Sequence, residues 1–293
     1  MHQIPVIGRR TLLQLAGVVL LGGHRLIGAT RAQTTGPQVT LLSAPLELVG
    51  EWGGSPPQAA ARVLSRMREV SLAGIELVSD QQPDKLRIDE HSSGPPAIWL
   101  HGDPPKTAWI IVDVGPLDWC KLAYQFGHEL GHVLCNSWGP NAGPRPPTQW
   151  LEEALVEAFS IRGLALLAVS WEQNPPFAGD AGFAVPIRQY RGNLVEGYQK
   201  QQTPGTDFAS WFAANRTGLE RGLPAPEGPA VLAALPELEH HKACVADLGA
   251  VNRWPARTEV PVEKYLSLWE KSCSEVGAPG RLPVRLRSLL ELG

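Results

Sequence analysis

The pattern of apolar and polar residues in the first half of the chain predicts several short strands. Apolar runs bounded by glycine, proline and polar residues lie at 39–42, 75–78, 86–89, 97–100 and 107–114. A helix is expected between the first two runs, over about residues 55–74. These features predict a small mixed β-sheet with at least one helix in the N-terminal half.

Beyond residue 117 the pattern becomes typical of helices. The first two helices are expected at about 118–136 and 148–168, separated by a loop rich in glycine and proline. Further helices are expected at about 186–201, 206–216, 229–235, 262–275 and 283–291. The predicted fold class is α+β, with a small mixed sheet in the N-terminal half and a mainly helical C-terminal half.

The N-terminus has the features of a targeting segment. Arg9 and Arg10 precede an apolar run that is short for a membrane-spanning helix. This arrangement resembles the twin-arginine export signal of bacteria, and the small residues around Ala32 suit a signal peptidase. We therefore expect residues 1–32 to be a cleaved signal peptide and the mature protein to be periplasmic or secreted. The alternative is an uncleaved N-terminal anchor.

Composition and charge narrow the choice of partners. A chain of 293 residues with 43% hydrophobic and 19% charged residues has the composition of a globular protein. Loss of residues 1–32 removes four arginines and no acidic residue, which leaves 22 basic and 29 acidic residues and a formal net charge of −7. Nucleic acid and anionic lipid are therefore poor candidate partners. No later segment looks apolar enough to span a membrane, so no stable membrane insertion is expected after signal cleavage.

The four cysteines are compatible with an oxidising compartment. Cys120 and Cys135 are separated by roughly 22 Å if they lie on one continuous helix, which is too far for a disulfide. We expect both to be buried thiols and predict a disulfide between Cys244 and Cys273. The alternative is that all four cysteines are reduced.

The segment HELGH at residues 128–132 is the main candidate for chemistry. On a helix His128 and His132 lie on one face, so that two imidazoles can converge on one cation. Glu129 projects about 100° further round the helix, within reach of a water molecule near that cation. The apolar neighbours of the motif indicate that the imidazoles are inside the protein. The alternatives are a surface helix with solvated histidines and a buried polar cluster without metal.

Catalytic zinc takes three protein ligands, and the next predicted helix offers a candidate for the third. Glu153, Glu157 and Ser160 form a polar stripe on a helix that is otherwise apolar, which is hard to explain unless the stripe faces something polar. Metzincins would place a glycine and a histidine after the first motif, where this chain has Cys135 and Trp138. That family is therefore excluded.

Residues 107–170, with the HELGH segment and the WLEE segment that begins at Trp150, resemble the gluzincins, which are thermolysin-like and aminopeptidase-like zinc metallopeptidases. The resemblance implies a zinc ion held by His128, His132 and Glu153. It further implies that Glu129 is the general base of hydrolysis. The strand at 107–114 is expected to be the edge strand along which an extended substrate lies.

The family also places a carboxylate one turn after the ligand glutamate, where it supports a histidine ligand. Glu157 occupies that position relative to Glu153. One turn after Glu152 the chain has Val156, which carries no carboxylate. Glu153 is therefore favoured over Glu152 as the ligand.

Gluzincins usually add a tyrosine or histidine from the C-terminal region to stabilise the oxyanion. The candidates in this chain are Tyr190, Tyr198, His240 and His241. We select Tyr198 as the residue that stabilises the oxyanion. The alternative is that Tyr198 only packs between helices. His240 and His241 are expected on a solvated turn.

The domain prediction is a signal peptide at 1–32, a zincin-like catalytic core at 33–170 and a helical subdomain at 171–293. The predicted function is that of a zinc-dependent metallopeptidase acting on a peptide or protein. The alternative is a catalytically silent exported zinc-binding module that recognises a peptide or cell-envelope partner. A weaker alternative is an exported interaction protein without metal.

Overall fold

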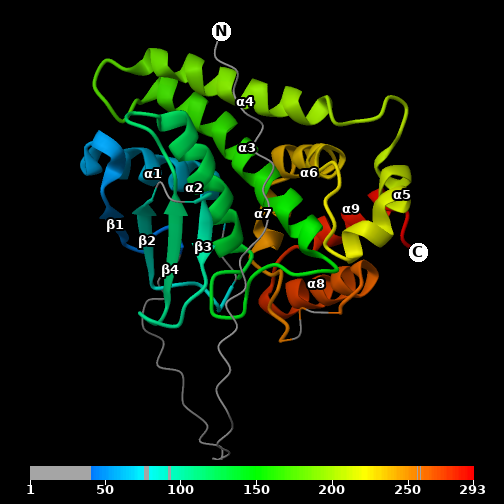
Figure 1. Ribbon diagram of the computed structural model, residues 1–293. Helices are drawn as coiled ribbons and strands as arrows, with labels where there is room; N and C mark the ends of the chain where they lie inside the picture. Colours follow the sequence, from blue (N-terminus) through cyan, green and yellow to red (C-terminus); the bar gives the residue numbers. More distant parts are fainter. Residues whose placement is uncertain (1–40, 76–78, 92–93, 256, 258) are drawn as a thin grey trace, which may run out of the picture. The chain divides into compact units, whose positions relative to one another are not determined.

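A four-stranded sheet forms one side of the protein (Figure 1), with the strand order β1-β2-β4-β3. The computed structural model describes residues 41–75, 79–91, 94–255, 257 and 259–293. Strands β1, β2 and β4 are parallel, whereas β3 runs antiparallel to β4. Their bounds are Leu46–Gly50 for β1, Lys85–Glu90 for β2, Ala97–Trp99 for β3 and Thr107–Val112 for β4. The small mixed sheet and the α+β class are therefore confirmed.

One face of the sheet is buried by helices. Alternate residues of β2 and β4, among them Leu86, Ile88 and Ile110, are fully buried, as expected for strands with one covered face. Helices α1 (Pro57–Leu72) and α2 (Trp119–Leu134) pack against this sheet. Gln125 of α2 accepts a hydrogen bond of 2.9 Å from the backbone N–H of Asp113, which ties α2 to the end of β4.

Two strand predictions need correction, and a third, at 75–78, lies mostly outside the described residues. Strand β4 was expected at the edge of the sheet, but it lies between β2 and β3, so the edge strand beside it is β3. Of the run at 39–42, residues 41 and 42 lie in a turn, where the N–H of Leu41 donates to Gln82. Ile75 is outside any strand, and residues 76–78 are not among the described residues. Short apolar runs are ambiguous, and at Leu41 a hydrogen bond to a side chain takes the place of strand pairing.

The remaining helices agree with prediction to within a few residues at most ends. Strand β1 and the seven-residue α7 were missed, because both are too short to show a clear period. The helices are α3 (Gln149–Gln173), α4 (Ala184–Gln199), α5 (Phe208–Glu220), α6 (Gly228–His240), α7 (Lys242–Leu248), α8 (Val262–Val276) and α9 (Arg281–Leu289), with short 3-10 helices at Trp52–Gly54 and Ala181–Phe183.

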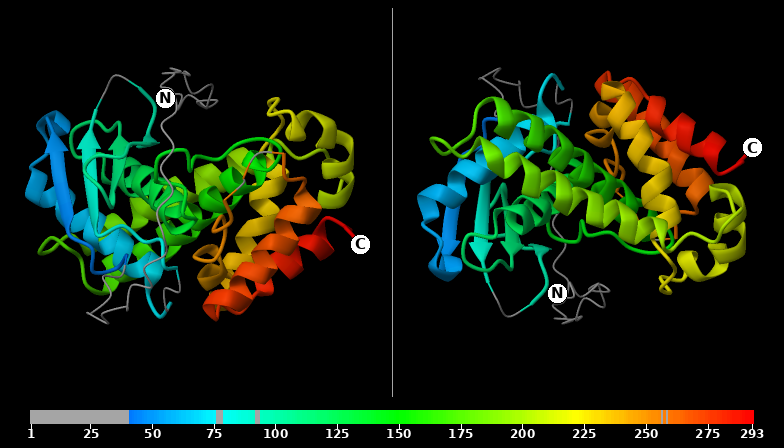
Figure 2. Two further views of the ribbon diagram at one scale, coloured as in Figure 1. Left: turned by 90° about the horizontal axis from the view of Figure 1, so that it is seen from below. Right: turned by 90° about the horizontal axis from the view of Figure 1, so that it is seen from above.

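Helix α3 is the central element of residues 39–293, which form one compact unit. Figure 2 shows the sheet and helices α5 to α9 on opposite sides of the α2–α3 pair. Among the described residues α3 alone is long and apolar enough to cross a membrane, with a mean hydropathy of 1.5, so the expectation of no such segment was wrong. Its apolar window is 78% buried within the protein, so packing accounts for this composition.

The predicted domain boundary at residue 170 falls within α3. Helices α4 and α6 of the C-terminal half pack along α3, while α1 and α2 contact it from the other half. The two predicted parts therefore share this helix. The predicted signal peptide at 1–32 lies outside the described residues.

All four cysteines are buried free thiols, so the predicted Cys244–Cys273 disulfide was wrong. Burial, followed by the nearby charge of Asp247, raises the pKa of Cys244 to about 11 and that of Cys273 to about 12. A high pKa disfavours the thiolate through which disulfides form. The prediction that Cys120 and Cys135 are buried thiols is confirmed.

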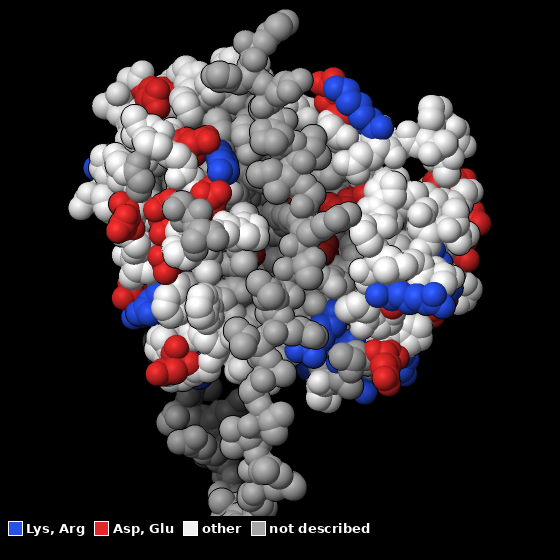
Figure 3. Space-filling model, viewed as in Figure 1, with Lys and Arg blue, Asp and Glu red and all other residues white. Residues whose placement is uncertain are grey.

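The surface charges of the described residues are interspersed on the face shown in Figure 3. Several are paired. One example is Arg253, whose guanidinium binds the Asp80 carboxylate through two hydrogen bonds of 3.0 and 2.9 Å.

Candidate metal centre

Two glycines allow α2 to approach its neighbours closely. A methyl group at Gly131 would lie 2.8 Å from Val156 Cβ and 3.1 Å from its Cα, on α3. A methyl group at Gly127 would lie 2.5 Å from Met67 Cε and 2.9 Å from Ser160 Oγ. A larger residue at Gly131 would therefore push α2 away from the backbone of α3, whereas at Gly127 the flexible end of Met67 and the Ser160 hydroxyl would have to move. The two glycines lower the helix propensity of α2. They also allow α2 to pack closely against α3, and the site depends on that contact.

The C-terminal turn of α2 is fixed by a Schellman motif. Asn136 adopts a left-handed conformation with φ of +60°. The N–H of Ser137 then donates to the carbonyl of His132 at 2.9 Å, and the N–H of Asn136 donates to that of Val133 at 3.1 Å. This capping defines the backbone of the turn that carries His132.

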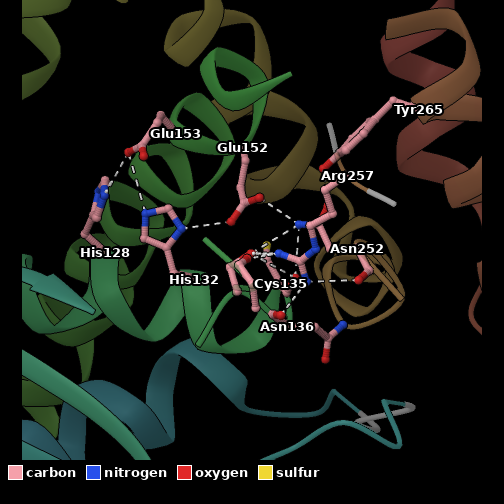
Figure 4. A network of polar contacts seen from close by, with 11 residues as sticks. His128, His132, Cys135, Asn136, Glu152, Glu153, Asn252, Arg257 and Tyr265 are labelled. Atoms are coloured by element: carbon pink, nitrogen blue, oxygen red, sulfur yellow. Dashed lines mark hydrogen bonds and ion pairs between the residues drawn. The ribbon is translucent and has the colours of Figure 1, made fainter. Parts of the chain in front are cut away.

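His128, His132 and Glu153 converge at the contact between α2 and α3 (Figure 4), and their ligand atoms all lie within 4.8 Å of one another. Both imidazoles are buried, with 2% and 6% of their surface exposed, as the apolar setting of the motif predicted. Their Nε2 atoms point to one oxygen, Glu153 Oε2, at 3.4 Å for His128 and 3.6 Å for His132. This buried cluster could hold a metal ion.

The spacing of these atoms suits a tetrahedral metal site better than direct hydrogen bonds. Hydrogen bonds between N–H and O are typically about 2.7–3.2 Å, shorter than both Nε2–Oε2 separations. Bonds of about 2.0–2.1 Å to zinc at tetrahedral angles place neighbouring ligand atoms about 3.4 Å apart. The donor set of two imidazole nitrogens and one carboxylate oxygen is one that zinc uses in catalytic sites.

Both imidazoles are oriented from behind by buried carboxylates of α3. Nδ1 of His128 lies 2.9 Å from Glu157 Oε2, and Nδ1 of His132 lies 2.9 Å from Glu152 Oε1. A carboxylate accepts, so each Nδ1 carries the proton and each Nε2 has its lone pair directed at the cluster when the ring is neutral. Glu157 thus lies where the sequence placed it. Glu152, set aside as a ligand, supports the second histidine.

The electrostatics of the cluster favour a positive charge at its centre. Burial, the largest influence, lowers the pKa of His132, but Glu153 and Glu152 outweigh it and hold the pKa well above its usual value. Burial raises the pKa of Glu153, but His132 and His128 outweigh it and hold the pKa well below its usual value. The carboxylate therefore stays charged and attracts a cation, either a proton on the imidazole or a metal ion.

Access to the cluster is on the side of Glu153, whose side chain is 30% exposed, compared with 2% for His128 and 7% for His132. Glu129, which follows His128 directly, is 2% exposed. Within the described part of the chain no residue hydrogen-bonds to its carboxylate.

A second group of polar residues surrounds Glu152, and no pattern in the sequence predicted it. Asn252, in the loop between α7 and α8, donates from Nδ2 to Glu152 Oε2 at 2.7 Å. The hydroxyl of Tyr265 on α8 donates to Asn252 Oδ1 at 3.0 Å, and Arg257 donates to the backbone carbonyl of Asn252 at 3.0 Å. Figure 4 shows this network next to the cluster of His128, His132 and Glu153.

The predicted oxyanion candidates come from α4 and from the end of α6. Tyr198 packs against the core near the end of α4. The ring of Tyr190 lies 5.8 Å from that of Tyr124, and burial raises the pKa of Tyr190. The neighbouring pair at 240 and 241 is exposed, as predicted for a solvated turn.

Tyr124 was also missed, although it lies on the HELGH helix. Its hydroxyl donates to Glu157 Oε1 at 2.8 Å, and its backbone carbonyl accepts from Ser160 Oγ at 2.7 Å. The spacing of one turn between Tyr124 and His128 is the sequence signal that could have identified it. The polar stripe of Glu153, Glu157 and Ser160 thus faces α2 along its whole length.

Comparison with models of protein families, with curated proteins and with solved structures finds no match for this chain. The interpretation of the site therefore rests on its own geometry and chemistry.

Proposed function

We propose that this protein is a zinc-dependent hydrolase that cleaves peptide bonds. The observation that carries the proposal is the convergence of two buried Nε2 atoms, from His128 and His132, on the carboxylate of Glu153. A bound zinc ion supplies Lewis acidity, which polarises a carbonyl group and makes water a stronger nucleophile at neutral pH. The resemblance of the HELGH and WLEE segments to gluzincins supports the same reading.

The chain supplies a base next to this cluster. Glu129 adjoins His128, is buried, and has no hydrogen-bond partner among the described residues. Its proposed role is to take a proton from water as the water attacks the scissile carbonyl and to return it to the leaving amine. A metal site with only a structural role needs no such base and usually recruits a fourth protein ligand.

The short edge strand β3 supports a peptide as substrate. It is paired with β4 on one side and packs against α2, the helix that carries both histidines. An extended peptide can bind such an edge through main-chain hydrogen bonds, which recognise peptides largely irrespective of sequence. The role of the edge strand that binds an extended substrate was predicted for residues 107–114, and it is therefore proposed for β3 instead.

The substitution Glu129→Gln tests this proposal. We expect the variant to bind zinc like the wild type, because Glu129 is not a ligand, and to hydrolyse an internally quenched peptide library about 10²–10⁴-fold more slowly, because the base is lost. Glu69→Gln is the matched control, since Glu69 is an exposed acid of α1 with 67% of its side chain accessible.

Hydrolysis by Glu129→Gln at the wild-type rate would refute the assignment of the base. A wild-type protein that binds zinc but cleaves no member of the library would instead indicate the catalytically silent zinc-binding module.

A further inference from the structure

The carboxylate of Glu152 is buried and has a different partner on each oxygen. Oε1 accepts from His132 Nδ1 at 2.9 Å and Oε2 accepts from Asn252 Nδ2 at 2.7 Å, while only 3% of the residue is exposed. A buried carboxylate holds its orientation only while its oxygens are hydrogen-bonded. The contact with Asn252 therefore determines how Glu152 meets His132.

The amide of Asn252 can adopt only one orientation in this setting. Acceptors surround Nδ2, namely Glu152 Oε2 at 2.7 Å, the carbonyl of Cys135 at 3.1 Å and Ser137 Oγ at 3.3 Å. The Tyr265 hydroxyl donates to Oδ1 at 3.0 Å, and burial holds the pKa of Tyr265 well above its usual value, so it remains a donor. A flipped amide would place its oxygen against the Glu152 carboxylate.

The backbone of Asn252 is fixed as well. The residue has a left-handed conformation, with φ of +62°, which asparagine tolerates better than most residues. One guanidinium nitrogen of Arg257 donates to the carbonyls of Asn136 at 2.6 Å and Asn252 at 3.0 Å. The charge of Arg257 also lies close to Glu152 and offsets the cost of burying its carboxylate.

We infer that Asn252 is a positioning residue for the metal centre, acting through Glu152 to hold His132 with its Nε2 directed at Glu153. The inference rests on the proposed metal site. The loop between α7 and α8 supplies no ligand itself, but through Asn252 it keeps one of the three ligands, His132, in place. Residues that orient metal ligands typically change metal affinity by about 10–100-fold when they are replaced.

Asn136 provides a matched control in the same network. It too is buried and left-handed, with φ of +60°, and its Nδ2 donates to the same loop, at the carbonyls of Gly249 at 3.0 Å and Val251 at 2.7 Å. Its Oδ1 accepts from Ser79 Oγ at 2.5 Å, and none of these side-chain hydrogen bonds involves Glu152. Asn136→Gly and Asn252→Gly therefore both preserve the left-handed backbone and loosen the same loop, but only the second removes a partner of Glu152.

The test measures Zn²⁺ affinity by competition with a chromophoric chelator, together with thermal stability, for the wild type and both variants. We expect the two variants to lose similar stability, Asn252→Gly to bind Zn²⁺ about 10–100-fold more weakly, and Asn136→Gly to stay within about threefold of the wild type. With Co²⁺ in the site, the visible absorption bands should shift in Asn252→Gly only, because they report the arrangement of the ligands.

Equal loss of Zn²⁺ affinity in both variants, or no loss in Asn252→Gly, would overturn the inference. If the wild type itself bound no Zn²⁺, the proposed function would fail, which is a distinguishable result. Tyr265→Phe keeps the test decisive if Asn252→Gly does not fold, since it removes only the hydroxyl that orients the amide. We expect Zn²⁺ affinity about 2–10-fold weaker in this variant, and unchanged affinity would count against the inference.

Discussion

The two histidines of the candidate centre are supported in different ways. His128 is held by Glu157, and Glu157 by Tyr124, and these two supporting residues lie on α3 and α2. His132 is held by Glu152, and Glu152 by Asn252, which lies 100 residues further along the chain. The hydrogen bonds that orient His128 thus join two packed helices. Those that orient His132 depend on how the C-terminal helices pack against them.

This difference implies that the two histidines respond differently to changes far from the site. A disturbance of the α7–α8 loop should reach His132 through Glu152 and leave His128 unaffected. Conversely, changes to Tyr124 on α2 or Glu157 on α3 should reach His128 first. Substitutions in the two sets of supporting residues test whether His128 and His132 differ in this way.

Among the residues that support the histidines, the largest effects are expected when the carboxylates lose their charge. Glu157→Gln and Glu152→Gln should each weaken Zn²⁺ binding by about 10–100-fold, because a neutral amide accepts more weakly from Nδ1 and its own NH₂ group can face the imidazole. Competition titration with a chelator measures both. If either variant bound Zn²⁺ as tightly as the wild type, the corresponding histidine would not need its carboxylate.

Double variants test whether the two halves are separate. Asn252→Gly and Glu152→Gln act on one chain of contacts, so their combined cost in Zn²⁺ affinity should be smaller than the sum of the single costs. Asn252→Gly and Glu157→Gln act on different histidines and should add to within about 0.5 kcal/mol. Additivity in the first pair, or strong coupling in the second, would contradict the division of the site.

The smallest effects are expected at the outer tyrosines. Tyr124→Phe removes the hydrogen bond to Glu157, and Tyr265→Phe removes the one to Asn252, each worth about 0.5–1.5 kcal/mol. Each variant should bind Zn²⁺ about 2–10-fold more weakly. NMR signals of the histidine rings should separate them, with Tyr124→Phe shifting those of His128 and Tyr265→Phe those of His132. Equal shifts of both rings in both variants would remove the contrast.

The same contrast explains which parts of the site the sequence predicts. Helical spacing places His128, Glu129 and His132 on adjoining faces of one helix, and it places Glu157 one turn after Glu153. Such local regularities can be read from residues alone. Asn252 and Tyr265 belong to no local pattern, because their positions follow from tertiary packing.

Glu152 shows how a local argument can overlook a supporting residue. Val156 stands one turn after it, so it seemed to have no partner on its own helix. Its partners are His132 on α2 and Asn252 in the distant loop. The glycines at 127 and 131 were likewise noted in the sequence, but the reason for them, close contact with α3 and α1, required the packed structure.

The fold shows the same division. The helical C-terminal half and the runs at 86–89 and 97–100 were predicted from period and composition, and both runs form strands. The order of strands in the sheet, which makes β3 rather than β4 the edge, depends on long-range pairing that no single run encodes.

The most direct test of the account is the zinc content of the mature protein, purified without a polyhistidine tag, beside that of Glu153→Ala. The account predicts about one zinc ion per wild-type chain and binding weakened more than about 100-fold in the variant, because one of three ligands is lost. A wild-type protein that takes up no zinc on titration would show that the cluster is a buried ion-paired network, and would contradict the central claim.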